Sequence, residues 1–272
     1  MEKSTDAEEL LRMISRNEFV IYGAGHIALK FLKVLKWYHL EGNVSCFVIS
    51  SSEPGKHDML EGIPVRNPEW LKEHKNSLVC IAVHEASSQE IIEHIQALGI
   101  AHYIWIYPYL YELMLGTPKE TGIKIRLADI IQTCEDDYRI AIRYAAIENY
   151  FEKNSYGFDL YIKAQALHSS RKTAEARLMK FCELMRAWQE NGYDEQSRIF
   201  INRKYEIIDG NHRVALAKYY DQQEILCDIF PSDISAAEVH GENAMLTKDV
   251  LLSGGFSLDE IAVLDKINER FQ

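Results

Sequence analysis

Five consecutive residues in the second half of the chain combine the groups that bind and transfer phosphate. Asp209-Gly210-Asn211-His212-Arg213 follows the apolar pair Ile207-Ile208 and precedes apolar residues at helical spacing that begin at Val214. This order predicts a strand, a turn and a helix. A glycine lets the backbone pass close to a ligand, and the free N–H groups of a first helical turn attract anions.

The charged and polar side chains of this segment could each have a different role at a bound phosphate. The guanidinium of Arg213 can clamp phosphate oxygens, and His212 can donate a hydrogen bond or neutralise charge. Asp209 could orient either of them, hold a metal or accept a proton. Asp-Gly turns are common, so a plain turn with exposed side chains is the alternative. We predict Asp209 and His212 as catalytic residues, and we predict cofactor binding by Gly210, Asn211, His212 and Arg213.

The elements that must hold this turn can be predicted from the surrounding pattern. Alternating apolar and basic residues over 123–127 predict an edge strand, and two helices are predicted over 137–152 and 173–190. Residues 198–201 and 205–208 predict a hairpin that leads into the turn. The aromatic and basic stretch 156–172 is a candidate substrate lid, or else a packed connection.

At residues 209–213, followed by Ala215 and Ala217, the sequence resembles the ParB/sulfiredoxin-like superfamily in the Asp-Gly-x-His-Arg form of its turn. The resemblance covers much of residues 122–230 and implies an α+β domain that binds nucleotide phosphates. Members include sulfiredoxin, CTP-using ParB partition proteins and kinases that phosphorylate free serine. Asn211 replaces the sulfiredoxin cysteine, and the tail 231–272 has no arginine-rich recognition helix, so those two activities are disfavoured.

The resemblance to the serine kinases implies a carboxylate base in the loop after the first strand of the domain. Glu135, Asp136 and Asp137 occupy such a loop, and Glu135 is taken as the candidate catalytic residue. Their alternative role is to form an acidic helix start favoured by the helix dipole. Phosphoryl transfer also requires a nucleotide, here ATP or ADP, together with Mg²⁺. No protein metal site is predicted.

The first half of the chain carries a second glycine turn. An apolar run over 19–22 leads into Gly23-x-Gly25-x-x-Ala28, and strands alternate with helices up to residue 106. This alternation predicts a parallel, doubly wound α/β sheet, with Gly23 and Gly25 as candidate phosphate-binding residues. NAD is disfavoured because the second strand ends in serines and Glu53 lies in a loop.

With Ile21–Gly25, Glu61–Val65 and the strand at 81–83, residues 17–107 resemble the small Rossmann-like domains of bacterial surface-polysaccharide and sugar-modifying proteins. This resemblance implies a site for a nucleotide-sugar or another nucleotide, or a scaffold whose glycine turn is empty.

Length and composition set the boundaries of these hypotheses. We predict a domain over 1–107, a linker over 108–121 and a second domain over 122–272. The net charge of −11 argues against nucleic acid as the main partner. A polar N-terminus, the lack of a membrane-length apolar run and five scattered cysteines favour a cytoplasmic protein.

Three functions follow as hypotheses. The first is a nucleotide-dependent kinase or phosphotransferase that acts on a small hydroxylated substrate in bacterial sugar or surface-polysaccharide metabolism. The second is a non-catalytic nucleotide or nucleotide-sugar binding protein, and the third is a ParB-like DNA-associated protein. The acceptor, the nucleotide base and the oligomeric state, a homodimer included, stay open.

Overall fold

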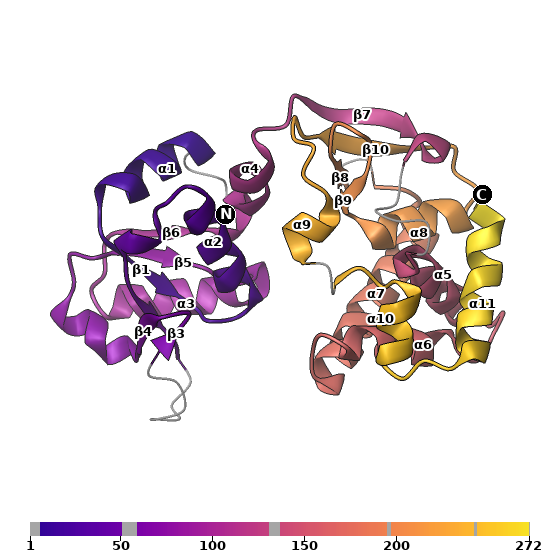
Figure 1. Ribbon diagram of the computed structural model, residues 1–272, viewed down its shortest axis with the longest axis horizontal. Coiled ribbons are helices and arrows are strands. Elements are labelled where there is room, and N and C mark those ends of the chain that lie inside the picture. The colour runs from indigo at the N-terminus through magenta and orange to yellow at the C-terminus, as the bar shows by residue number, and fades with distance from the viewer. Residues whose placement is uncertain (1–5, 51–58, 131–136, 195–196, 242–243, 272) are drawn as a thin grey trace. The chain divides into compact units, whose positions relative to one another are not determined.

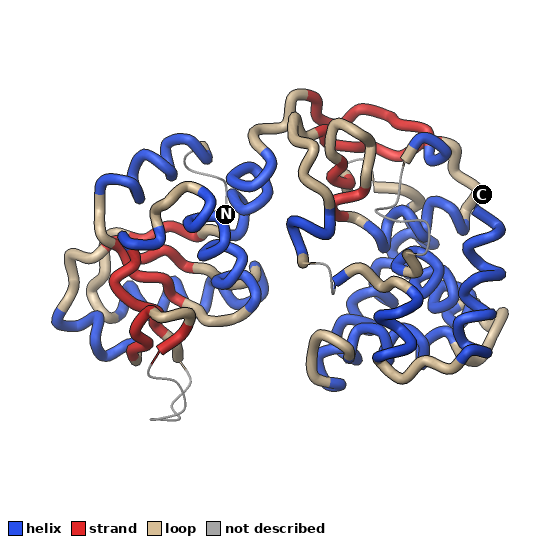
Figure 2. Tube along the Cα trace, viewed as in Figure 1, coloured by secondary structure: helices blue, strands red, loops and turns tan. Residues whose placement is uncertain are grey.

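A computed structural model describes residues 6–50, 59–130, 137–194, 197–241 and 244–271 of the chain (Figures 1 and 2). The chain divides into two compact units, Met1–Thr117 and Pro118–Gln272. Each unit has its own sheet and its own helices, so each is described by itself.

Unit 1 is built on a six-stranded, mostly parallel sheet in the order β3-β4-β2-β1-β5-β6. All neighbours pair in parallel except β3 and β4, which are antiparallel. The mixed α/β class with a largely parallel sheet is as predicted. The strands are β1 (Phe19–Tyr22), β2 (Val44–Val48), β3 (Met59–Leu60), β4 (Ile63–Arg66), β5 (Leu78–Ile81) and β6 (Tyr103–Trp105).

Helices cover both faces of this sheet. The ring of Phe19 packs 6.2 Å from that of Phe31 on α2 (His26–Trp37), while the next residue, Val20, packs in a cluster with Ile92 and Ile95 of α3 (Glu85–Ala97). Because successive strand residues point to opposite faces, a strand covered on both sides is apolar throughout. Unit 1 also contains α1 (Ala7–Arg16), the short helices Glu41–Asn43, Pro68–Glu73 and Tyr107–Tyr109, and α4 (Leu110–Leu115).

The boundary between the units lies within the segment 108–121, which is predicted from the sequence to be a linker. Residues Leu110–Leu115 of that segment form α4, whose apolar side chains are buried. The hydroxyl of Tyr38 on unit 1 donates to the carbonyl of Leu113 at 3.0 Å. This part of the segment therefore belongs to unit 1, and β7 begins at Glu120.

Unit 2 has a four-stranded sheet in the order β7-β10-β8-β9. β10 (Glu224–Ile229) pairs in antiparallel with β7 (Glu120–Arg126) and in parallel with β8 (Ile199–Ile201). β8 and β9 (Ile207–Asp209) form an antiparallel pair. The edge position of β7 and the hairpin before residue 209 are as predicted.

The helices of unit 2 gather on one side of its strands in Figure 1. They are α5 (Arg139–Tyr150), α6 (Gly157–Ala166), α7 (Arg171–Asn191), α8 (Asn211–Tyr219), α9 (Ala236–His240), α10 (Lys248–Ser253) and α11 (Leu258–Asn268), with short helices at Leu127–Asp129 and Glu269–Phe271. The helix α5 is buried over most of its circumference, including Arg139 and Arg143. The sequence pattern predicted an apolar stripe only.

The candidate lid over 156–172 contains a packed helix. A Cβ on Gly157 at the start of α6 would lie 1.9 Å from the carbonyl oxygen of Ala145, so α6 and α5 are in direct backbone contact. Leu160, Tyr161 and Ala164 of α6 are buried. The structure therefore favours the packed connection over the lid.

Two further sequence expectations concern the whole chain. Cys46, Cys80 and Cys227 are free and buried, and burial raises the pKa of Cys46 to about 11 and that of Cys227 to about 12. These thiols are therefore packing residues. Every helix in the described ranges is too short or too polar to cross a bilayer.

Candidate anion-binding site

The segment 209–213 forms the strand, turn and helix that its pattern predicts. β9 ends at Asp209, and Gly210 precedes α8 with φ 109°, in the left-handed region. A Cβ on Gly210 would lie 2.4 Å from Cγ2 of Ile199, so the turn passes directly over β8. The glycine is therefore required by backbone conformation and by packing inside the protein, and not only by the approach of a ligand.

The turn presents an exposed carboxylate next to open backbone donors. The Oδ1 atom of exposed Asp209 accepts a hydrogen bond from the N–H of Gly210 at 2.8 Å. Asn211 and His212 begin α8, and their N–H groups donate to none of the described residues, whereas the N–H of Arg213 already donates to the carbonyl of Gly210 at 2.9 Å. The arrangement suits an oxyanion, because the N-terminal end of a helix carries partial positive charge.

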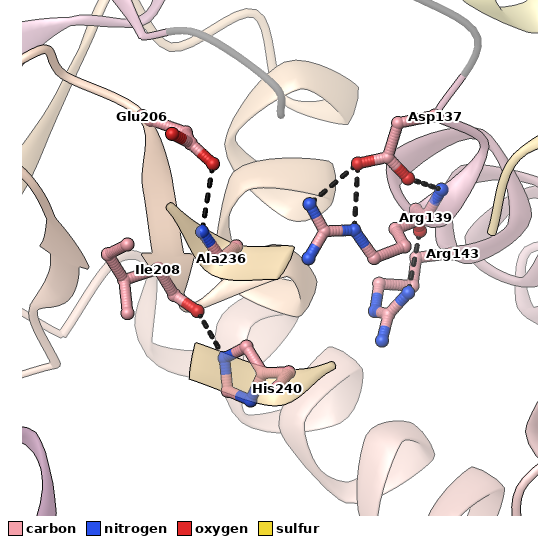
Figure 3. Close-up of polar contacts among 7 residues, drawn as sticks. All are labelled: Asp137, Arg139, Arg143, Glu206, Ile208, Ala236 and His240. Carbon is pink, nitrogen blue, oxygen red and sulfur yellow. Dashed lines mark hydrogen bonds and ion pairs between the residues drawn. The ribbon is translucent and has the colours of Figure 1, made fainter. Parts of the chain in front are cut away.

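The helix α9 holds β9 in place up to the turn, as Figure 3 shows. The ring Nε2 of His240 donates to the carbonyl of Ile208 at 2.8 Å, and Oε1 of buried Glu206 accepts from the N–H of Ala236 at 2.9 Å. These contacts from α9 fix the residues that lead up to Asp209.

His212 is partly buried against aromatic side chains. Its Nε2 lies 2.8 Å from the hydroxyl of Tyr161, and its ring meets that of Phe181 edge-on at 4.4 Å. Burial holds the pKa of His212 well below its usual range, and the positive charges of Arg143, Arg213 and Arg177 lower it further. Of the two roles expected for His212, a lowered pKa favours the hydrogen bond over charge neutralisation.

Arg143 is a buried cation whose place near the turn could not be predicted from the sequence. Its residue is 8% exposed, and Nη1 donates to the carbonyl of Arg139 at 2.7 Å. The nearby carboxylate of Asp137 is taken by Arg139, through Nε at 2.7 Å and Nη2 at 2.6 Å (Figure 3). Among the described residues, Nε of Arg143 has no acceptor and its guanidinium has no ion pair.

The charge of Arg143 is buried, and nearby carboxylates compensate it only in part. Burial lowers the pKa of Arg143, whereas the nearby carboxylates of Asp137 and Asp209 raise it. Taking a charge out of water without pairing it costs several kcal/mol. The only advance signal was the placement of Arg139 and Arg143 one turn apart among apolar residues of α5.

Two more polar side chains of the turn bear on ligand binding. Arg213 donates from Nε to the hydroxyl of Ser197 at 2.7 Å, which fixes the direction of its guanidinium. The Oδ1 of Asn211 is buried and has no hydrogen-bond partner among the described residues. Buried polar atoms are normally paired, so this oxygen is a second unsatisfied group at the same turn.

The three candidate acids after β7 have different outcomes. Glu135 and Asp136 lie outside the described residues. Asp137 is fully buried, and its two oxygens accept from the N–H and the guanidinium of Arg139. It therefore serves to hold the start of α5 and is not placed to act as a base.

The glycine turn of unit 1 has the predicted backbone form. Gly23 has φ 118°, and a Cβ there would lie 2.8 Å from the carbonyl oxygen of Ala82. Ala28 is fully buried, as a small packing residue should be. Gly25 precedes α2 with φ −82°, and a Cβ there would meet nothing within 4 Å. The fold requires a glycine at position 23 but not at position 25.

Other concave or polar features lie away from these turns. A cavity of about 530 Å³ in unit 2 is lined by residues that include Lys124, Tyr193 and Gln222. Because Gln222 follows the C-terminal end of α8, this cavity is at the opposite end of that helix from Asp209. Within the part of the chain that the structure describes, no three metal-ligating side chains cluster together.

The chain matches no protein-family model, and it has no significant match among curated proteins or solved structures. Its function is therefore argued from the geometry of its own residues.

Proposed function

We propose that the protein is a nucleotide-dependent phosphotransferase that moves a phosphoryl group to the hydroxyl of a small molecule at the turn 209–213. The observation that carries the proposal is the buried guanidinium of Arg143, which has no ion pair among the residues that the structure describes. Its charge lowers the pKa of His212, and the charge of Asp209 in turn raises the pKa of Arg143. A bound phosphate would supply an anion beside the turn.

The division of roles follows from position and charge. Arg143, Arg213 and the first N–H groups of α8 are the candidate phosphate donors. Asp209 is the exposed carboxylate at the same turn and is the candidate base for the acceptor hydroxyl. Glu135 stays a second candidate, on the loop outside the described residues.

A nucleotide of this kind is expected to arrive with Mg²⁺, and the residues present are compatible with that. Mg²⁺ is usually held by phosphate oxygens and one or two carboxylates, and not by a protein cage. Asp209 can provide one such ligand because its carboxylate is exposed. The ion would neutralise charge on the phosphates. ATP and ADP are the donors that the resemblance suggests.

For unit 1 we propose a Rossmann-like nucleotide or nucleotide-sugar site at Gly23 and Gly25. The support is the strand order β4-β2-β1-β5-β6 and the open space at Gly25, which precedes α2. The proposal of a sugar or surface-polysaccharide pathway for the whole protein rests on the resemblance of this half alone.

The test is a thermal-shift screen of ATP, ADP, CTP, UDP-glucose and NAD with Mg²⁺, followed by phosphoryl transfer to a panel of sugars and hydroxylated metabolites. The expected result is stabilisation by one nucleotide, with turnover that Asp209→Asn abolishes while nucleotide binding persists. Asp221→Asn is the matched control, because Asp221 is an exposed acid at the opposite end of α8. It should leave both unchanged.

Nucleotide binding without transfer to any acceptor would favour a non-catalytic nucleotide-binding protein. Salt-sensitive binding to DNA would favour the ParB-like alternative. Stabilisation by none of these ligands would contradict the proposal as a whole.

A further inference from the structure

We infer that Tyr161 is a positioning residue that holds His212 as a neutral imidazole with its proton on Nδ1, so that Nδ1–H donates to an oxyanion of the ligand. The inference rests on the proposed function for the identity of that oxyanion. It assigns His212 a hydrogen-bonding role, in place of proton transfer or charge neutralisation. Tyr161 belongs to α6, and neither its pattern nor its spacing predicted contact with the turn.

The hydrogen bond between Tyr161 and His212 determines which ring nitrogen of His212 carries the proton. The side chain of Tyr161 is fully buried, and the ring nitrogen Nε2 of His212 is the one hydrogen-bond partner that the described residues give its hydroxyl. A buried phenol has one proton to donate, and leaving it without an acceptor is costly. Tyr161 must therefore donate, and Nε2 must accept.

The charge state of His212 follows from its surroundings. Cationic side chains approach it from three elements: Arg143 on α5, Arg177 on α7 and Arg213 on α8 itself. The phenol of Tyr161 on α6 stays protonated, because burial raises its pKa. A positively charged imidazole would face these cations and would offer a second donor to Tyr161, so His212 is neutral. A neutral imidazole that accepts at Nε2 carries its proton on Nδ1.

The free donor is placed at the turn and not in the aromatic core. Nδ1 is the ring nitrogen nearer the main chain, and His212 is the second residue of α8. The far side of the ring is enclosed by Tyr161 and Phe181. Nδ1 makes no hydrogen bond to the described residues and is not among the fully buried unpaired atoms. A ligand oxygen at the start of α8 is its natural partner.

The decisive measurement is the ring ¹⁵N spectrum of His212 in the full-length protein at pH 7, assigned by its loss in His212→Asn. The expected result is one neutral tautomer, with a protonated Nδ1 and an unprotonated Nε2. In Tyr161→Phe, Nε2 loses its donor, so we expect a shift toward the Nε2–H tautomer. An imidazolium, or a dominant Nε2–H form in the wild type, would overturn the inference whatever the protein binds.

Substitutions at position 212 test the use of Nδ1–H with inorganic pyrophosphate and ADP as probes, by calorimetric titration in Mg²⁺. The amide nitrogen of Asn occupies a place close to Nδ1, whereas that of Gln lies near Nε2. His212→Asn should bind the probes within about 3-fold of the wild type, and His212→Gln about 10-fold or more weakly. Equal losses in the two variants would contradict the role of Nδ1.

These outcomes separate the inference from the proposed function. If the tautomer is as expected and pyrophosphate binding depends on Nδ1, but no acceptor is phosphorylated, transfer is wrong and the oxyanion site stands. If transfer occurs and the tautomer is reversed, the proposed function stands and the role of Tyr161 is wrong. Purely structural damage by Tyr161→Phe would lower Tm without moving the tautomer.

Discussion

The Nη1 atom of Arg143 donates to the carbonyl oxygen of Arg139, one turn earlier on α5, at 2.7 Å. Arg139 in turn binds both oxygens of Asp137 through its guanidinium and its N–H. Arg139 is thus paired with an acid, whereas the described residues give Arg143 a carbonyl as its acceptor and no carboxylate. Because the two arginines differ in this way, the stability of the ligand-free protein can show whether Arg143 supports the fold or serves ligand binding.

Arg143→Met should stabilise the ligand-free protein by about 1–2 kcal/mol, because it removes an unpaired buried charge and retains an apolar stem. Arg139→Met should destabilise it by about 3–5 kcal/mol, because Asp137 is then left buried and unpaired. Differential scanning calorimetry without and with pyrophosphate measures both effects. The stabilising variant should also lose most of the pyrophosphate-induced shift in Tm. A fall in Tm for Arg143→Met would mean that Arg143 supports the fold.

Gly210→Ala should destabilise unit 2 by about 2–4 kcal/mol. The new Cβ would overlap Ile199, and φ 109° is strained for any residue with a side chain. Gly25→Ala is the matched control in unit 1, because its φ is −82° and a Cβ there meets open space. The control should change the free energy of unfolding by no more than about 0.5 kcal/mol. Denaturant unfolding of both variants measures the two changes in the free energy of unfolding. Equal changes would contradict the claim that the fold requires glycine at position 210 but not at position 25.

Gly25→Ala also tests ligand binding by unit 1. Because the substitution should leave stability unchanged, a change in ligand affinity can be assigned to the turn itself. If unit 1 binds a nucleotide-sugar at this turn, the added methyl group should weaken UDP-glucose binding by several-fold while Tm stays constant. An unchanged affinity would place that ligand elsewhere or remove it from the hypothesis. Such a result would leave the site in unit 2 untouched.

The pKa of His212 makes a prediction about stability and pH. Its folded-state pKa is lowered by burial and by three arginines, so the unfolded state binds a proton more readily. The stability contributed by neutral His212 is therefore complete above the unfolded pKa of about 6.5 and is lost as pH falls below it. The loss is about 1.4 kcal/mol per pH unit at most, because a single proton is involved.

His212→Asn should remove this contribution, so the difference in unfolding free energy between variant and wild type should narrow between pH 7 and pH 5. His168 has a lowered pKa of the same sign, and His168→Asn measures its separate share. Urea titrations across this range provide the data. Parallel curves for the wild type and His212→Asn would show that His212 is not kept neutral by the fold.

Local pattern was enough to predict the elements that present each turn. The short apolar runs before Gly23 and Asp209 are typical of buried strands, and the apolar residues that follow each glycine turn recur at helical spacing. The basic alternation over 123–127 marked an edge strand, because only one of its faces needs to be apolar. These are short-range rules, and they succeed where tertiary packing agrees with them.

The groups that complete the site depend on contacts between distant segments. Tyr161 and His212 are 51 positions apart in sequence, and Arg143 approaches from a third helix. Helical spacing in the sequence predicts one apolar face for the helix over 137–152 but cannot reveal that the opposite face of α5 is also buried. Tyr161 was assigned to a possible lid because aromatic and basic residues resemble a surface loop when their partners are unknown.

The hydrogen bond from Arg213 to Ser197 gives a last prediction about the phosphate clamp. Nε of Arg213 donates to the Ser197 hydroxyl at 2.7 Å. This one hydrogen bond orients the guanidinium and so determines where its terminal nitrogens point. Ser197→Ala keeps the cation but loosens it, so the affinity for ADP with Mg²⁺ should fall by about 3- to 10-fold. Arg213→Ala removes the cation and should cost about 10-fold or more, with a weaker dependence of affinity on salt. Titrations at two salt concentrations separate a lost charge from a misdirected one. If Ser197→Ala proved as damaging as Arg213→Ala, Ser197 would itself have to contact the ligand.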